Sequence, residues 1–152
     1  MNLKTEMRRS EKAITDIHYI KSILKKAPVG ILSMCKSKTP YSIPVNFYYE
    51  DSTIYIHCAK KGQKIEYITK NPHVCFLVVN PVETTETECG GAMNYESILC
   101  MGKASFFDTS PREVLQKLGE KYSTCSDITD EQCQETALIT IGIEEVSAKK
   151  GF

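Results

Sequence analysis

Long apolar runs are absent from this sequence of 152 residues. No run approaches the roughly 18 apolar residues that span a bilayer, and the polar residues 1–9 lack the apolar core of a secretory signal. A net charge is also absent, because 19 Lys and Arg residues balance 19 Asp and Glu residues. Without a basic excess, the chain has no general attraction to nucleic acid or an anionic membrane. We therefore expect a cytoplasmic protein that binds neither.

Paired cysteine motifs are missing as well, although cysteine itself is frequent. The number of cysteines is odd and no CxxC occurs, so the spacings do not resemble a zinc site. Several cysteines lie in apolar, strand-like surroundings, which favours buried reduced thiols and no metal. The seven residues are Cys35, Cys58, Cys75, Cys89, Cys100, Cys125 and Cys133.

The length and composition predict one domain over residues 1–152, with residues 1–13 as a charged, loosely held arm. Hydrophobic residues make up 41% and charged residues 25% of the chain, which is ordinary for a globular protein. A domain of this size buries a modest core, so dimerisation would add stability.

The order of predicted elements favours a barrel. Thr15 or Asp16 can cap the first helix, Pro44 predicts a bulge or an unpaired N–H in the second strand, and Ser110 can cap the third helix. Consecutive strands joined by short turns favour antiparallel pairing. No GxGxxG follows a strand, which excludes the usual dinucleotide fold. We expect a mainly β (α+β), six-stranded antiparallel closed or split barrel with peripheral helices. Helices are predicted at 16–27, 63–70 and 110–122, and strands at 29–35, 41–49, 53–58, 74–79, 96–107 and 136–146. Long loops are predicted at 81–94 and 123–134, the second with or without a short helical turn.

A small basic turn over residues 57–64 carries the strongest chemical signal. It follows the alternating apolar residues 53–56 and precedes a helix-like run. Free backbone N–H groups at a helix start, together with Lys64, would converge on one anion. Lys64 could equally be a solvated surface residue, and Gly62 fits a turn of either kind. The turn therefore predicts a phosphate site without proving one.

Four blocks of sequence resemble the pyridoxamine-phosphate-oxidase-like flavoproteins with a split-barrel fold. Within them the chain looks like the Nim group, which is associated with 5-nitroimidazole resistance. The blocks keep the order and rough spacing of that group over nearly the whole chain. They are residues 7–9 with 14–16, the strand IPVNFYY at 43–49, the turn HCA-x-x-G-x-K at 57–64, and the segment containing Cys89, Met93, Tyr95, Ser97 and Gly102.

The resemblance implies an FMN-dependent oxidoreductase that passes electrons from NAD(P)H to a small acceptor such as a nitroimidazole. It also implies a homodimer with FMN at the interface, where the Ser97 position approaches FMN from the second subunit. His57 would be the catalytic residue, donating a hydrogen bond or a proton to the acceptor. The implied FMN-binding residues are Pro44, Val45, Asn46, Phe47, His57, Cys58, Ala59, Gly62, Gln63, Lys64, Tyr95 and Ser97.

The sequence departs from the family at three of these blocks. Cys58 stands where serine or threonine is common, Gln63 replaces an arginine, and Glu96 stands where the Nim group often has arginine. The strand at 43–47 lacks the arginine of true pyridoxamine-phosphate oxidases. This difference counts against oxidation of vitamin B6 more than it counts against FMN binding. Two alternatives remain on the same fold: a flavin-binding protein without catalysis, and a haem-binding or haem-degrading protein in which His57 or His18 is the axial ligand.

Overall fold

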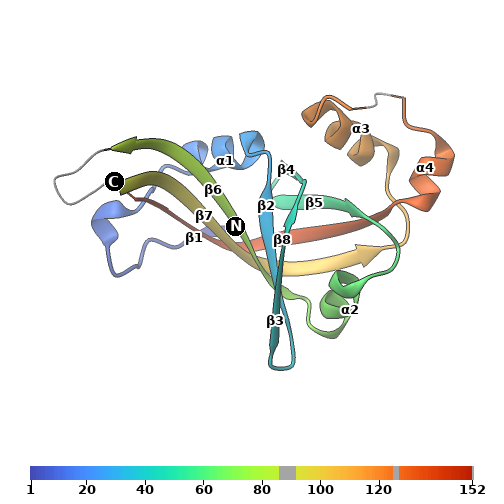
Figure 1. Ribbon diagram of the computed structural model, residues 1–152, viewed down its shortest axis with the longest axis horizontal. Coiled ribbons are helices and arrows are strands. Elements are labelled where there is room, and N and C mark those ends of the chain that lie inside the picture. Colours follow the sequence, from blue (N-terminus) through green and yellow to red (C-terminus); the bar gives the residue numbers. More distant parts are fainter. Residues whose placement is uncertain (86–91, 125–126, 152) are drawn as a thin grey trace.

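The computed structural model describes residues 1–85, 92–124 and 127–151. Figure 1 shows a curved sheet with α3 and α4 at one end and the segment before α1 at the other. The helices are α1 (Ile17–Lys26), α2 (Gln63–Lys70), α3 (Arg112–Lys121) and α4 (Asp130–Glu135), with a 3-10 turn η1 (Ser10–Lys12). The strands are β1 (Asn2–Leu3), β2 (Gly30–Lys36), β3 (Thr39–Val45), β4 (Tyr48–Glu50), β5 (Thr53–Cys58), β6 (His73–Thr85), β7 (Ala92–Phe107) and β8 (Ala137–Lys150).

The strands form one sheet in the order β3-β2-β6-β7-β8-β5-β4, with β1 added to β8. Every pair along this order is antiparallel. The mainly β split-barrel prediction is therefore confirmed. The described residues form eight strands, two more than the six predicted. The second predicted strand divides into β3 and β4, and β1 joins the sheet in parallel.

The split arises in β8. Residues 137–142 pair with β5, whereas residues 145 and 146 pair with β1 along the same edge. On its other edge β8 pairs with β7, and a bulge between Met101 and Gly102 shifts the register there. A Cβ on Gly102 would lie 2.1 Å from the carbonyl oxygen of Gly142, so only glycine permits this approach.

The core lies between the concave side of the sheet and α1. Phe47 and Phe76 meet edge to face with ring centroids 4.9 Å apart. A Cβ on Gly30 would clash with the Phe76 ring, so a glycine makes room for this aromatic pair. The apolar face of α1 and two buried residues of α2 belong to the same core cluster as this pair. None of the helices in the described part of the chain has both the length and the apolar character that crossing a bilayer requires.

The structure decides between the two expectations for Pro44 and corrects the one for the first residues. Pro44 causes no bulge: it pairs in register with Ile31 on the edge strand β3, where a residue without an N–H donor is tolerated, as the second expectation has it. The break falls at residues 46 and 47. The arm at 1–13 is not loose, because β1 pairs with β8 and the Ile14 amide donates to the Ala148 carbonyl over 2.9 Å.

Two boundaries also differ from the predictions. Ser110 does not cap α3: Pro111 has an extended ψ of 137°, the helix begins at Arg112, and the buried Ser110 hydroxyl has no partner within the described residues. The predicted loop at 81–94 is largely a hairpin, because β6 continues to Thr85 and β7 begins at Ala92. Its Cys89 lies outside the described residues. By contrast, β5 and α2 have the predicted bounds, and Asp16 caps α1 as expected.

Candidate functional site

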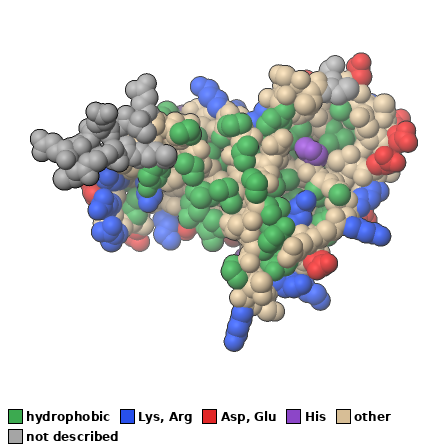
Figure 2. All heavy atoms as spheres, in the orientation of Figure 1, with side chains coloured by type: hydrophobic (Ala, Val, Ile, Leu, Met, Phe, Trp, Pro, Cys, Tyr) green, Lys and Arg blue, Asp and Glu red, His purple; other side chains and the backbone are tan. Residues whose placement is uncertain are grey.

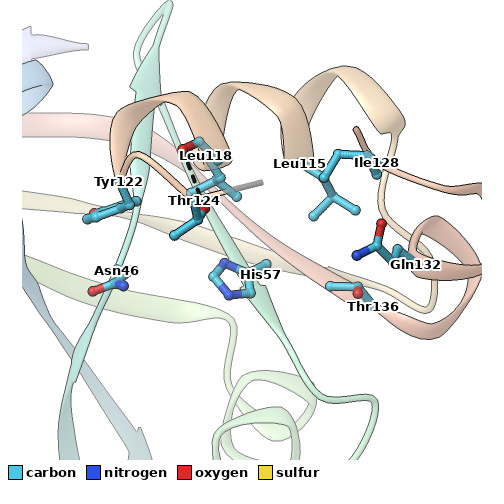
Figure 3. Close-up of a pocket in the computed structure, with 10 residues that line it drawn as sticks. Asn46, His57, Leu115, Leu118, Tyr122, Thr124, Ile128, Gln132 and Thr136 are labelled. Atoms are coloured by element: carbon cyan, nitrogen blue, oxygen red, sulfur yellow. Dashed lines mark hydrogen bonds between the residues drawn. The ribbon is translucent and has the colours of Figure 1, made fainter. Parts of the chain in front are cut away.

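A pocket of about 330 Å³ opens where the β3–β4 connection and β5 face the two helices α3 and α4. Two of the predicted site residues line it: Asn46 from the connection and His57 from β5. Figure 3 shows both side chains across the pocket from α3. The residues that complete the wall are Leu115, Leu118, Gly119, Tyr122, Thr124, Ile128, Gln132 and Thr136.

His57 is held neutral by its surroundings. The protein around the imidazole lowers the pKa of His57 below its ordinary value of 6.5, and the positive charge of Lys64 lowers it further. A neutral imidazole carries one N–H donor and one acceptor nitrogen. His57 can therefore donate one hydrogen bond to a ligand in the pocket at neutral pH.

The turn between β5 and α2 has the features of an anion site. Gly62 precedes the helix with φ at +141°, a conformation that favours glycine, and no side chain caps the helix. The amides of Gln63 and Lys64 are the first two of α2 and have no partner within the helix. Half-buried Lys64 adds a positive charge that acts on both His57 and Cys58. The turn therefore brings two N–H groups and an ammonium group to the same end of β5 as His57.

Cys58 is a buried thiol beside this turn. Burial raises the pKa of Cys58, and the charge of Lys64 offsets part of the effect. The thiol form therefore dominates at neutral pH, which makes this cysteine a quiet core residue. The neighbouring predicted residues Ala59 and Gln63 are exposed at the turn.

The β3–β4 connection is fixed by α3. Phe47 is 0% exposed, so its side chain belongs to the core. Its amide donates to the Tyr122 hydroxyl over 2.9 Å, and its carbonyl accepts from Lys121 Nζ over 2.9 Å. Both backbone groups of Phe47 are thus used inside the protein. The predicted ligand contacts on this segment fall to exposed Pro44, half-buried Val45 and exposed Asn46.

Lys121 is unusual among the lysines of the chain. Burial lowers the pKa of Lys121 to about 8. Its ammonium lies 3.9 Å from the centroid of the Phe47 ring, a cation–π contact that accompanies the hydrogen bond. This lysine holds α3 against the floor of the pocket.

Tyr95 and Ser97 do not reach this pocket. Both lie on the outer face of β7, where they line a separate apolar cleft of about 460 Å³. The pairing register places side chains of four strands in one row on this face: Ile31, Leu77, Leu99 and Ser147. Figure 2 shows hydrophobic side chains gathered in the middle of the molecule, over β2, β6 and β7. We call this surface the outer apolar face; its exposed members are Ile31, Val79, Leu99 and Met101.

The helical wall of the pocket was missed from the sequence. Leu115 and Leu118 are spaced like core residues of an amphipathic helix, and nothing in that spacing points to a ligand. One signal was available for α4: Thr129 and Gln132 form a capping box, with the Gln132 amide donating to Thr129 Oγ1 over 3.1 Å. That motif favours the short helical turn over a plain loop at 123–134, and α4 is that turn.

This split barrel with its basic turn is the scaffold of a flavin-binding class of proteins. Residues 16–150 match the sequence profile of the family described as pyridoxamine 5'-phosphate oxidase, and the chain belongs to that family. No curated protein matches the chain by sequence.

Solved structures agree with this assignment. The chain is similar to a candidate 5-nitroimidazole antibiotic resistance protein from Bacteroides thetaiotaomicron, at 25% identity and a TM-score of 0.78, covering 91% of this chain and 86% of that one. It is similar in fold to a flavocytochrome from Azotobacter vinelandii, with 19% identity, a TM-score of 0.76 and coverage of 95% and 72%. It is also similar in fold to an FAD- and haem-binding protein from Mycobacterium smegmatis, with 16% identity, a TM-score of 0.76 and coverage of 91% and 72%.

Proposed function

We propose that this chain is an FMN-dependent reductase that works as a homodimer in the cytoplasm. It would pass electrons from NAD(P)H to a small acceptor, of which a nitroimidazole is the example suggested by the Bacteroides relative. The observation that carries the proposal is the convergence of Lys64, His57 and Asn46 on one end of the barrel. In a member of the pyridoxamine 5'-phosphate oxidase family, that convergence fits a flavin phosphate and a reacting centre.

The phosphate end of the cofactor would lie at the start of α2. Gly62 leaves the approach open, since no atom lies within 4 Å of the position a Cβ would take. The amides of Gln63 and Lys64 would donate to phosphate oxygens, and the Lys64 ammonium would neutralise their charge. The hydroxyl that serine or threonine would supply is replaced by the Cys58 thiol, so Lys64 and the backbone carry more of the binding.

The reacting end would lie toward the pocket of Asn46 and His57. The flavin supplies electron transfer between NAD(P)H and the acceptor. The protein supplies position: His57 donates one hydrogen bond to the acceptor, and Asn46 adds an amide on the same side. Leu115 and Leu118 of α3 exclude water from the opposite wall.

A second copy of the chain would complete the site. Tyr95 and Ser97 stand on the outer apolar face, away from the pocket that holds His57. An apolar face of this kind is unfavourable in water and is typical of a protein–protein contact. Two copies that cover these faces against each other would bring Ser97 of one chain toward the cofactor of the other. The homodimer therefore explains both the apolar face and the separation of the predicted site residues.

Haem binding is a second candidate, favoured by one observation. His57 is neutral and faces a pocket with apolar walls, which is the state and setting that an axial ligand requires. Exposed His18, at the start of α1, faces no such pocket. Two of the similar structures are a flavocytochrome and an FAD- and haem-binding protein.

Absorption spectra of the purified protein test both candidates. We expect flavin bands after incubation with FMN and gel filtration, and bleaching of the band near 450 nm, a rough value, by NADH or NADPH. A protein that stays colourless contradicts the proposal. Bound FMN that neither nucleotide reduces favours flavin binding without catalysis. A Soret band on haem addition that is lost in His57→Ala favours the haem candidate.

A further inference from the structure

A second, strongly basic pocket lies at the opposite end of the molecule from α3. Its volume is about 420 Å³, within the range of sites for small organic ligands. Residues from both ends of the described chain line it, including Arg8, Arg9 and Lys12 from the first segment and Lys149 and Lys150 from the end of β8. The ring of Tyr95 forms part of its wall. We call it the basic pocket.

The charged residues that line the basic pocket in the described part of the chain are all cationic. There are five of them, and no acidic residue stands among the described lining residues. Among the described residues, no ion pair involves Arg8, Arg9 or Lys12. The buried Glu96 nearby accepts hydrogen bonds from Tyr19 and Asn80. In a chain whose net charge is zero, such a concentration of positive charge attracts anions.

The backbone holds these cations in place. η1 carries Lys12, and an isolated bridge pairs Ala13 with Lys149. The Gly151 amide donates to the Tyr95 carbonyl over 2.7 Å, which fixes the end of β8 against the start of β7. A Cβ on Gly151 would lie 2.5 Å from the Tyr95 ring, so the ring packs directly on this glycine. The pocket is therefore built into the fold by the same contacts that hold residues 1–13 against β8.

The shape and neighbours of the basic pocket indicate the ligand. Arginine guanidinium groups bind phosphate oxygens in pairs, so Arg8, Arg9 and Lys12 together suit more than one phosphate group. Tyr95 offers an aromatic ring for a planar base. The same Tyr95, with Met7 and Lys149, also lines the apolar cleft next to it, so an apolar surface continues from the charged one. We infer that the basic pocket binds the diphosphate and base of a nucleotide, which is the chemistry shared by ADP, NAD(P)H and FAD.

Calorimetric titration of the full chain with ADP tests this inference. We expect ADP to bind, pyrophosphate to bind more weakly and adenosine to show no binding. Added salt should weaken the binding of ADP. In Arg8→Ala/Arg9→Ala the ADP affinity is expected to fall at least about tenfold, because two charge-assisted contacts are lost. Lys25→Ala/Lys26→Ala is the matched control: it removes two exposed positive charges from α1 and should leave ADP binding unchanged.

Displacement experiments distinguish the natural source of the nucleotide. Displacement of ADP by NADPH in FMN-loaded protein identifies the electron donor, and displacement by FAD identifies a flavin dinucleotide. The inference is overturned if wild type fails to bind ADP at millimolar concentration, or if the arginine variant binds as wild type does. It is also overturned if the control weakens binding equally, since that indicates general surface charge.

These experiments can refute the nucleotide-binding inference and the proposed FMN site independently of each other. No residue of α2 or β5 lines the basic pocket, and the one residue it shares with the expected FMN site is Tyr95. The arginine variant leaves Tyr95 in place, so FMN titration of this variant followed in the visible range should match wild type. Wild-type protein that binds ADP but never FMN would refute the proposed function and leave this inference intact.

Discussion

The hydroxyl of Tyr122 accepts a hydrogen bond from the backbone amide of Phe47 over 2.9 Å and donates to the carbonyl of Pro28 over 2.8 Å. One phenol at the end of α3 thus joins the β3–β4 connection to Pro28, two residues before β2. The connection carries Asn46, which lines the pocket with His57. The position of α3 and the geometry of the candidate site therefore depend on the same bond.

Replacing Tyr122 by phenylalanine should destabilise the protein. Tyr122→Phe leaves the Phe47 amide without its partner, and an unsatisfied buried donor costs about 1–3 kcal/mol. Urea unfolding followed by circular dichroism measures the loss. Tyr55→Phe is the control, because the Tyr55 hydroxyl makes no hydrogen bond to the described residues and the ring contact with Tyr48 remains. Equal stability of Tyr122→Phe and wild type would show that this bond contributes nothing.

Lys64→Ala should weaken FMN binding by about tenfold to a hundredfold, because a charge-assisted phosphate contact contributes roughly 1.5–3 kcal/mol. Quenching of flavin fluorescence measures the affinity. Riboflavin lacks the phosphate, so its weaker binding should not change in the variant. Lys61→Ala removes an exposed charge from the same turn and serves as the control. Unchanged FMN affinity in Lys64→Ala would refute the assignment of the phosphate site.

His57→Ala should slow reduction of the acceptor by about a hundredfold, the lower end of what a positioned proton donor contributes. FMN affinity and the rate of flavin reduction by NAD(P)H should stay close to wild type, because the phosphate contacts lie at α2. Stopped-flow absorbance separates the two half-reactions. His57→Gln should recover part of the rate if a hydrogen bond is the main contribution. An acceptor rate in His57→Ala equal to wild type would remove His57 from the reaction.

Leu99→Glu should prevent association of the proposed homodimer. Leu99 is 37% exposed at the centre of the outer apolar face, between Leu77 and Ser147. A carboxylate there would be buried without a partner, which is strongly unfavourable. Light scattering after gel filtration should report a monomer for the variant and a dimer for wild type. Phe107→Glu places the same change on an exposed apolar residue at the C-terminal end of β7, eight positions from Leu99, and should leave the dimer intact. A monomeric wild type would refute the homodimer.

Lys121 should make stability rise with pH between about 8 and 10. Its pKa in the folded protein is about 8 against an ordinary value of 10.5. Between these values the unfolded chain binds more protons than the folded one, so the free energy of unfolding increases with pH. Lys121→Met should remove this contribution. The quantity to measure is the difference between wild type and variant in urea titrations at pH 7 and 9.5, because tyrosines and cysteines that titrate nearby cancel in it. A pH-independent difference would contradict the lowered pKa.

Local signals predicted the elements whose ends are set by their own residues. β5 alternates apolar and polar positions, and α2 is bounded by Gly62 and by Asn71 before proline, so both have the predicted bounds. β6 and β7 are longer than predicted, because their outer ends are paired with each other and carry little apolar alternation. The first segment pairs with β8 through backbone groups, which leave no mark in the pattern of side chains.

The candidate site also has a part that local sequence predicts and a part that only long-range contacts define. The approach of His57 to Lys64 follows from a strand and a helix joined by a short turn, which the sequence shows. The approach of Asn46 to α3 depends on Tyr122, 75 residues further along than Phe47, and no local pattern encodes it. His57 and Ser97 line two separate cavities. Their placement depends on the pairing of β5, β8 and β7, which the spacing of residues in the sequence does not predict.

That arrangement has a genetic consequence. In the proposed homodimer each cofactor would be held by the α2 turn of one chain and the β7 face of its partner. A chain damaged at Lys64 and a chain damaged at Ser97 would each form a defective dimer alone. Mixed together, they would form hybrid dimers in which one site contains both lesions and the other contains neither. Two inactive alleles expressed in one cell would therefore complement each other, and activity would return in proportion to the hybrid fraction.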